Sequence, residues 1–255
     1  MGDIPGSLDG KGVVITGGGT GIGRATAHQF AAEGAQVLVV GRTAARLEET
    51  AVVHPSISAF AADGAAADGP ERIVEAALQQ LGRIDVLVNN AAITRPAALG
   101  TIDRRTAEEQ LATNLLTPVF LAQAALPHLT AAKGTIVNVS SNPPSYGWPD
   151  NSIYGSTKVA LDFLTATWAV ELAPKGVRVV SVAPGITATP VLTHAGFTQE
   201  QIAALGEGLI ERIPLGRIAQ PSEIAWWIVN VARPEAGYLT GTVVRVDGGL
   251  SVAAG

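Results

Sequence analysis

The chain has 255 residues, of which 47% are hydrophobic and 15% charged, and it contains 29 glycines and no cysteine. This composition is typical of a globular protein, and the length allows one large domain or two small ones. The formal net charge of −5 argues against nucleic acid as the main partner, because phosphate binding needs clustered lysine and arginine. The lack of cysteine excludes disulfides, Cys-ligated zinc and thiol nucleophiles.

The N-terminus, MGDIPGSLDGKG, is polar and glycine-rich and has no apolar signal core, and no apolar run is long enough to span a bilayer. We therefore expect a cytoplasmic protein with no membrane partner. The four scattered histidines lack the spacing of metal ligands, so no metal site is predicted.

Apolar runs that are typical of strands alternate with helical stretches along nearly the whole chain. The strands are expected at 12–16, 35–40, 56–63, 85–91, 134–141, 176–184 and 241–248. The helices are expected at 22–33, which Gly34 would cap, and at 43–51, 68–81, 104–130, 152–173 and 221–232. Continuous Val- and Ile-rich strands that alternate with helices indicate an α/β fold, a doubly wound and mostly parallel seven-stranded sheet with helices on both faces.

No linker, repeat or low-complexity tract divides the chain, so residues 1–255 are predicted to form a single domain. The stretch from about 190 to 215 fits neither a strand nor a long helix. It follows a strand and precedes the last long helix, where a substrate lid could lie.

A glycine-rich loop, TGGGTGIG (16–23), joins the first strand to the first helix. Its glycines Gly17, Gly21 and Gly23 have the spacing GxxxGxG rather than the commoner GxGxxG. Glycine permits a tight turn and a close approach of the backbone to a pyrophosphate, and the following helix directs its free N–H groups at the phosphates. The loop alone is a weak signal, but its position between strand and helix favours dinucleotide binding.

The residues after the second strand indicate which dinucleotide is bound. A carboxylate there would bond the 2′-hydroxyl of NAD, whereas an arginine would accommodate the 2′-phosphate of NADP. Here Gly41 and Arg42 follow the strand, and no acid occurs before Glu48. This favours NADP(H) over NAD(H), with the alternative that Arg42 is merely a solvated charge at the start of a helix.

Tyr154 lies four residues before Lys158 on one face of the expected helix 152–173, and Ser141 ends the fifth expected strand. In a parallel α/β sheet the carboxyl ends of the strands form the ligand crevice, so these residues should face the glycine loop. A tyrosine has a pKa near 10, and a nearby ammonium would lower it. This arrangement predicts proton transfer by Tyr154, tuned by Lys158, with Ser141 holding a substrate oxygen while hydride moves.

Asn114 is a fourth candidate because Pro118 follows it by four residues in a helical segment. Proline has no N–H, so the Asn114 carbonyl loses its helical partner and the helix should kink there. An ordered water next to Lys158 could then bond this carbonyl and link the site to solvent, although an ordinary proline kink satisfied by neighbouring groups is an equal alternative.

These motifs closely resemble those of the short-chain dehydrogenase/reductase superfamily, in its compact one-domain branch. The matching segments follow in order: TGGGTGIG (16–23), NNAA (89–92), Asn114, Ser141, YGSTK (154–158), PGITAT (184–189) and YLTGTVVRVDGG (238–249). The resemblance covers nearly the whole chain. It implies a Rossmann-type fold, an NAD(P)(H)-dependent oxidoreductase, and a homotetramer or homodimer.

The resemblance also implies a set of residue roles. Asn114, Ser141, Tyr154 and Lys158 would be catalytic, with Lys158 also a ligand of the nicotinamide ribose. The candidate cofactor-binding residues are Gly17, Gly19, Thr20, Gly21, Ile22, Gly23, Arg42, Asp63, Gly64, Asn90, Ala91, Tyr154, Lys158, Pro184, Gly185, Thr187 and Thr189. The predicted reaction interconverts a carbonyl and a secondary alcohol, as in a carbonyl reductase or alcohol dehydrogenase.

The sequence does not name the substrate, because the loops near 93–97, 142–149 and 190–212 set it and contain no recognisable code. Their apolar residues favour a modestly hydrophobic ketone or alcohol: Ile93, Pro96, Leu192, Phe197, Leu205 and Leu209. The segment after Ser141 departs from the family. Tyr146 or Trp148 there could present a ring to the substrate, although packing of the loop is the expected role of Trp148. Two alternatives to a reductase are a non-catalytic dinucleotide sensor or scaffold and an NAD-dependent dehydrogenase that works oxidatively.

Overall fold

The computed structural model describes residues 8–142, 147–190, 198, 200, 208 and 210–253. Within these residues seven strands form one sheet in the order β3-β2-β1-β4-β5-β6-β7. The strands are β1 (Gly12–Thr16), β2 (Gln36–Gly41), β3 (Ile57–Ala61), β4 (Val86–Asn89), β5 (Thr135–Val139), β6 (Arg178–Pro184) and β7 (Val243–Val246). Every neighbouring pair is parallel, so the prediction of seven strands is confirmed and the sheet is wholly rather than mostly parallel.

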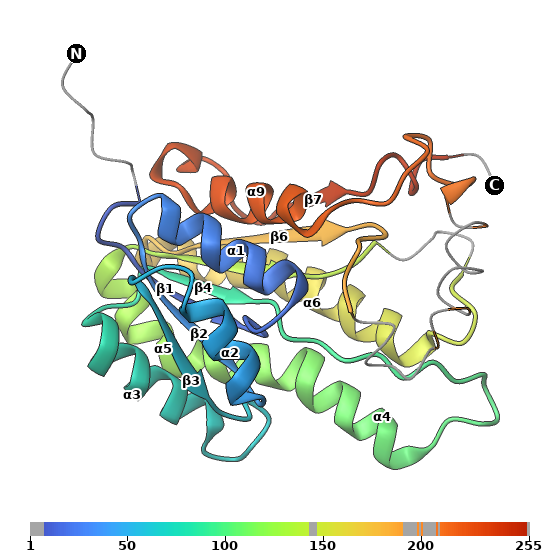
Figure 1. Ribbon diagram of the computed structural model, residues 1–255, viewed down its shortest axis with the longest axis horizontal. Coiled ribbons are helices and arrows are strands. Elements are labelled where there is room, and N and C mark those ends of the chain that lie inside the picture. Colours follow the sequence, from blue (N-terminus) through green and yellow to red (C-terminus); the bar gives the residue numbers. More distant parts are fainter. Residues whose placement is uncertain are drawn as a thin grey trace.

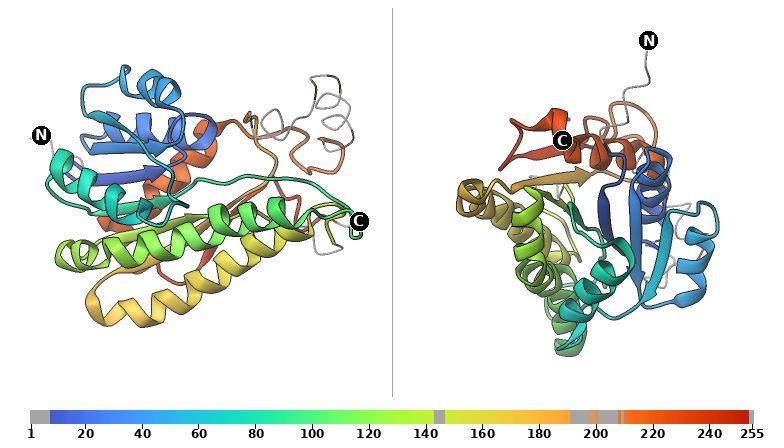
Figure 2. Two further views of the ribbon diagram at one scale, coloured as in Figure 1. Left: turned by 90° about the horizontal axis from the view of Figure 1, so that it is seen from below. Right: turned by 90° about the vertical axis from the view of Figure 1, so that its left-hand side faces the viewer.

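Helices cover both faces of this sheet (Figure 1). They are α1 (Gly21–Ala32), α2 (Ala44–Ala51), α3 (Gly69–Leu81), α4 (Arg104–Leu111), α5 (Thr117–Ala132), α6 (Ser152–Leu172) and α9 (Pro221–Ala232). Short helices also occur, a π-helical turn η1 (Ala112–Leu116) and the 3-10 turns η2 (Ala173–Lys175) and η3 (Pro234–Ala236). Helices α1 and α9 pack together on one face, and α3, α5 and α6 lie on the other, where α4–α5 and α6 run side by side (Figure 2).

The two helical layers make two separate cores, because successive side chains of a strand point to opposite faces. In β1, Val13 and Ile15 join α1 and α9 in one core, whereas Val14 packs with α3 and α5 in the other. All five residues of β1 are buried. Burial on both faces explains why the strands read as continuous apolar runs.

Several strands end earlier than the sequence suggests. β5 ends at Val139, so Ser141 lies two residues beyond the strand rather than at its end, and β4 ends at Asn89, before Asn90 and Ala91. These residues therefore lie beyond the hydrogen-bonded strands, at the carboxyl edge of the sheet. The first helix ends as expected, with Gly34 just beyond it at φ +89°.

The expected helix 104–130 is interrupted at the π-helical turn η1, where the amide of Thr117 donates to the carbonyl of Ala112. Pro118 follows immediately, so the α-helical pattern changes to a π turn just before the proline, whereas the kink expected there stays a prediction. The expectation that no apolar run is long enough to span a bilayer was wrong, because the helical segment Arg104–Ala132 passes that test by length and composition. In this fold its residues Leu121, Ala125 and Leu129 are buried in a core, so it is a packed helix of the domain.

Candidate active site

Helix α6 places three polar side chains on one face at intervals of one turn: Tyr154, Lys158 and Asp162. The last residue of β5, Val139, and the two residues that follow it each bind one of these side chains. The Ser141 hydroxyl hydrogen-bonds Tyr154, the Val139 carbonyl accepts from Lys158 Nζ at 2.9 Å, and the Ser140 hydroxyl hydrogen-bonds Asp162. The structure therefore brings the predicted Ser141, Tyr154 and Lys158 together at the carboxyl edge of the sheet.

The pKa of Tyr154 shifts in the opposite direction from the expectation. Burial of its hydroxyl raises the pKa of Tyr154, and the hydrogen bond with Ser141 opposes this rise. Lys158 Nζ lies 5.7 Å from the centre of the tyrosine ring. The predicted lowering of the tyrosine pKa by lysine is therefore not found in the protein without cofactor, because burial outweighs the other influences.

Lys158 is almost fully buried, with 2% of its surface exposed. Burial lowers its pKa to about 8, and the nearby negative charge of Asp162 opposes that change. The ammonium is therefore largely protonated at neutral pH, as its predicted role requires. Its hydrogen bond to the Val139 carbonyl fixes it beside the end of β5.

Asn114 lies in the π turn and is 1% exposed. Its side chain forms two hydrogen bonds with the backbone of Ile93, to the amide at 2.9 Å and to the carbonyl at 2.9 Å, and a third with Thr157 Oγ1 at 3.3 Å. The amide side chain thus joins the segment after β4 to α6, a role that sequence reasoning did not foresee. Pro118 has no N–H to donate to the Asn114 carbonyl, as expected. The water relay through that carbonyl stays a prediction.

Trp148 contacts the catalytic candidate directly. Its ring packs edge-on against Tyr154, with the ring centres 5.5 Å apart and the planes at 80°. This geometry is favourable for two aromatic rings because a positive edge meets a negative face. Trp148 therefore does more than pack its own loop, since it forms an aromatic wall beside the Tyr154 side chain.

Side chains hydrogen-bond the backbone carbonyls of the glycine loop. Three consecutive carbonyls each accept a side-chain hydrogen bond, Gly17 from Asn90, Gly18 from Thr50 and Gly19 from Arg24. The side-chain Nδ2 of Asn90 also donates to the Thr16 carbonyl at 2.9 Å. Asn90, predicted to line the cofactor groove, thus also shapes the loop that would hold the phosphates.

The loop has the close approaches that a dinucleotide cradle needs. A Cβ atom on Gly23 would lie 2.3 Å from the Gly17 carbonyl oxygen, so only glycine fits there. Gly17 and Gly21 have φ values of +66° and +52°, which also favour glycine. The N-cap residue of α1, Thr20, makes no side-chain cap bond, and the first turn contains no acid. The helix end and these glycines therefore fit the pyrophosphate of a dinucleotide.

Three further predicted cofactor residues follow the second and third strands. Arg42 follows β2, is exposed, and pairs with no other described residue. Asp63 lies after β3, and its carboxylate accepts a hydrogen bond from the Ala65 amide at 3.0 Å. Gly64 is next to it, and a Cβ there would lie 2.7 Å from the Thr117 side chain.

The segment after β6 reaches the glycine loop from the other side. The Thr187 hydroxyl donates to the Gly185 carbonyl at 3.1 Å, which shapes the turn that follows Pro184. Thr189 lies beside the loop, because a Cβ on Gly21 would lie 3.1 Å from its methyl group. The structure therefore gathers the PGITAT segment and the glycine loop at one place.

Of the predicted substrate-facing residues, Ile93 and Pro96 belong to the described segment after β4. Leu192, Phe197, Leu205 and Leu209 lie outside the described residues, as does most of the expected lid.

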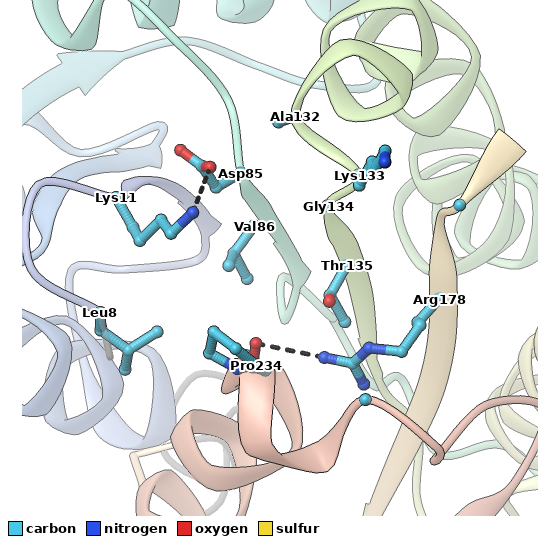
Figure 3. A pocket seen from close by; sticks show the side chains of 13 residues that line it. Leu8, Lys11, Asp85, Val86, Ala132, Lys133, Gly134, Thr135, Arg178 and Pro234 are labelled. Atoms are coloured by element: carbon cyan, nitrogen blue, oxygen red, sulfur yellow. Dashed lines mark hydrogen bonds and ion pairs between the residues drawn. The ribbon is translucent and has the colours of Figure 1, made fainter. Parts of the chain in front are cut away.

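A pocket also opens at the amino ends of the strands, opposite the candidate site (Figure 3). Two of its cations are engaged within the protein, since Lys11 pairs with Asp85 at 3.2 Å and Arg178 donates to the Ala232 carbonyl at 3.3 Å. Because Lys11 and Arg178 serve the fold, we assign this pocket no ligand.

Three polar residues behind the site were not among the predicted ones: Asp162, Ser140 and Ser181. The signal for Asp162 is present in the sequence, since it continues the four-residue spacing from Tyr154 and Lys158. The two serines could not be found this way, because only the sheet register brings β6 against the end of β5.

The wholly parallel sheet, the glycine loop and the Ser141, Tyr154 and Lys158 cluster define a Rossmann-type oxidoreductase. Residues 17–251 match a family model described as enoyl-(acyl carrier protein) reductase. The chain belongs to the short-chain dehydrogenase/reductase superfamily, which confirms the resemblance seen in the sequence.

Similar proteins extend over the full length of the chain. It is 36% identical to a 3-oxoacyl-(acyl-carrier-protein) reductase of Thermotoga maritima, over 96% of this chain and 99% of that protein. It is 35% identical to the L-xylulose reductase of Bos taurus, over 95% and 97% of the two chains. A 3-ketoacyl-(acyl-carrier-protein) reductase from Brucella melitensis, solved as a complex with NADH, superposes with a TM-score of 0.88 at 31% identity, over 96% and 99% of the chains.

Proposed function

We propose that this protein is an NADP(H)-preferring oxidoreductase that interconverts a ketone and a secondary alcohol. The observation that supports it most is the alignment of Ser141 and Tyr154 by a hydrogen bond, with the buried Lys158 one helical turn away. These groups lie at the carboxyl edge of the sheet, where α/β folds bind ligands.

A bound reduced nicotinamide would supply the hydride. Tyr154 would donate its proton to the carbonyl oxygen of the substrate, and Ser141 would hold that oxygen by a hydrogen bond. The Lys158 ammonium would stabilise the phenolate that remains, because it is buried near the tyrosine and water does not screen its charge strongly. In the oxidative direction the same groups would act in reverse.

Arg42 supports the preference for NADP(H). It is exposed at the end of β2, where a 2′-phosphate would lie, and no acid occurs before Glu48. The Brucella relative was solved with NADH, so the superfamily also contains NADH binders at this level of similarity. The proposed preference for NADP(H) therefore rests on Arg42 rather than on similarity.

The substrate class is set by the apolar surroundings of the site. The relatives include an acyl-carrier-protein reductase and a sugar reductase at nearly equal identity, so similarity does not select between them. Trp148, Ile93 and Pro96 favour a modestly hydrophobic ketone over a polyol.

The test is a kinetic screen of both cofactors against ketones, secondary alcohols, sugars and acyl thioesters, followed by the Tyr154→Phe variant. We expect the oxidation of NADPH with a ketone to be faster than with the other classes. Tyr154→Phe should lower turnover at least 100-fold, on the order of what general acid catalysis contributes, while NADPH still binds. Retained activity in this variant would contradict the assignment.

Two alternatives have distinct outcomes in the same screen. A non-catalytic sensor or scaffold would bind NADPH tightly and turn over no substrate. A dehydrogenase that works oxidatively would oxidise alcohols with NAD faster than it reduces ketones.

We further propose a homotetramer, or a homodimer, in the cytoplasm. The family resemblance implies pairing through the long helices, and apolar side chains are exposed on them: Leu116 and Phe120 on the η1–α5 segment, and Val159, Phe163 and Val170 on α6.

A further inference from the structure

Asp162 lies at the centre of a buried polar cluster behind the candidate active site. Its Oδ1 atom is 2.7 Å from the Ser181 hydroxyl, and the Ser140 hydroxyl also hydrogen-bonds its carboxylate. The two serine oxygens are 3.0 Å apart, and both serines are buried, at 0% and 3% exposure. One carboxylate of α6 thus binds hydroxyls from β6 and from the end of β5.

This cluster is directly joined to the reacting groups. Ser140 precedes Ser141 in the chain, so a fixed Ser140 side chain limits how Ser141 can turn toward Tyr154. The backbone of the same segment is held by the Ser140 amide, which donates to the Val182 carbonyl at 3.0 Å. Asp162 therefore supports the segment that presents Ser141.

Asp162 is also one helical turn from Lys158, where side chains four residues apart are neighbours. Among the described residues, the charged groups that face Asp162 are Lys158 on α6 and Arg245 on β7. Tyr154 and Asp162 are the titratable groups near Lys158. Removing the carboxylate would leave the buried ammonium without its nearest negative charge.

Burial of the Asp162 carboxylate makes its negative charge unfavourable in the folded protein. Burial raises the pKa of Asp162, while the two serine hydroxyls and the two cations oppose this rise. A raised pKa means that the ionised form is less favourable in the folded protein than in the unfolded chain. The negative charge itself therefore does not stabilise the folded protein.

We propose that Asp162 is a positioning residue of the active site, which fixes the Ser140–Ser141 segment and places a negative charge beside the Lys158 ammonium. This inference rests on the proposed reductase function. Asp162 acts through Lys158 and Ser141, and it does not itself touch the reacting atoms.

The first test measures Lys158 directly and does not depend on turnover. The chain has only four lysines, so the ε-carbon resonances of ¹³C-labelled lysine can be assigned with single variants. In wild type the Lys158 resonance should titrate with a midpoint near pH 8. In Asp162→Asn, which keeps the size and an acceptor oxygen for Ser181, the midpoint should fall by about one unit. An unchanged midpoint overturns the proposal.

The second test is the pH dependence of kcat/KM for ketone reduction. The reaction needs a charged Lys158, so activity should fall at alkaline pH, and in Asp162→Asn this fall should begin about one unit lower. Asp162→Glu should restore the wild-type profile because it restores the charge. Ser181→Ala is the matched control, since it removes a hydrogen bond to Asp162 but keeps the carboxylate. It should lower thermal stability and leave the alkaline limb in place.

The outcomes separate this inference from the proposed function. If wild type is active, Tyr154→Phe is inactive, and Asp162→Asn has the wild-type profile, only the role of Asp162 is overturned. If Asp162→Asn and Ser181→Ala lose stability equally and neither moves the alkaline limb, Asp162 is merely structural. If wild type reduces no carbonyl compound with either cofactor, the proposed function fails, and the role of Asp162 in it fails as well.

Discussion

The Nζ atom of Lys158 lies 5.7 Å from the centre of the Tyr154 ring and is tied to the end of β5 by a 2.9 Å hydrogen bond to Val139. The lysine is buried in this position, and burial lowers its pKa to about 8 from a usual value of 10.5. A buried charge that would suit the proposed catalysis is therefore unfavourable for folding at neutral pH.

This conflict predicts a specific dependence of stability on pH. Between about pH 8 and 10.5 the unfolded chain binds the Lys158 proton and the folded protein does not, so the contribution of Lys158 to stability rises with pH in that range. Relative to Lys158→Met, wild type should gain about 3 kcal/mol in unfolding free energy across it. Urea unfolding of the protein without cofactor at several pH values measures this difference. Lys175→Met, at an exposed lysine, is the control for the exchange of lysine for methionine.

Arg42 should determine the cofactor preference. Arg42→Ala removes a charge-assisted hydrogen bond to the 2′-phosphate, which is worth about 1.5–3 kcal/mol, so the Kd for NADPH should rise roughly 10- to 100-fold. The Kd for NADH should stay the same, because NADH has no phosphate there. Fluorescence titration with both cofactors measures the change, and Arg72→Ala on α3 is the control. Equal weakening of both cofactors would show that Arg42 only supports the local structure.

The sequence predicted the order of strands and helices and most of the site because those features are local. Glycine spacing, the Tyr154–Lys158 interval and Pro118 act within one or two turns of chain. The bonds from Thr50 and Arg24 to the glycine loop could not be predicted, since they depend on how α2 and α1 dock after folding. The raised pKa of Tyr154 is a similar case, because burial is a property of the packed site rather than of the motif.

Gly23 should tolerate no side chain. The added methyl group of Gly23→Ala would meet the Gly17 carbonyl oxygen at 2.3 Å, so the glycine loop must shift. We expect a loss of about 1–3 kcal/mol in unfolding free energy and at least a tenfold rise in the Kd for NADPH. Gly155→Ala is the control within a helix, because its methyl group would meet nothing closer than Trp148 at 3.8 Å. A stable Gly23→Ala protein with normal cofactor affinity would contradict the predicted cradle.

Trp148 should affect apolar substrates more than polar ones. Trp148→Ala removes the ring that packs against Tyr154, an interaction worth about 0.5–1.5 kcal/mol, and opens the site to water. The KM for a hydrophobic ketone should rise several-fold, while the KM for a small hydrophilic carbonyl compound should change little. Trp148→Phe keeps an aromatic ring and should resemble wild type. Equal effects on both substrates would show that Trp148 acts only by holding Tyr154.

Phe163 should lie at a subunit interface. Its side chain is 72% exposed on α6, and Val159 and Val170 are exposed at neighbouring positions of the same helix. In a symmetric pair each substitution occurs twice, so a charge in Phe163→Glu would be buried twice against an apolar partner. Sedimentation velocity should therefore show a smaller species for Phe163→Glu than for wild type. Val53→Glu, an equally apolar exposed position after α2, should leave the oligomer intact, and a monomeric wild type would contradict the proposed assembly.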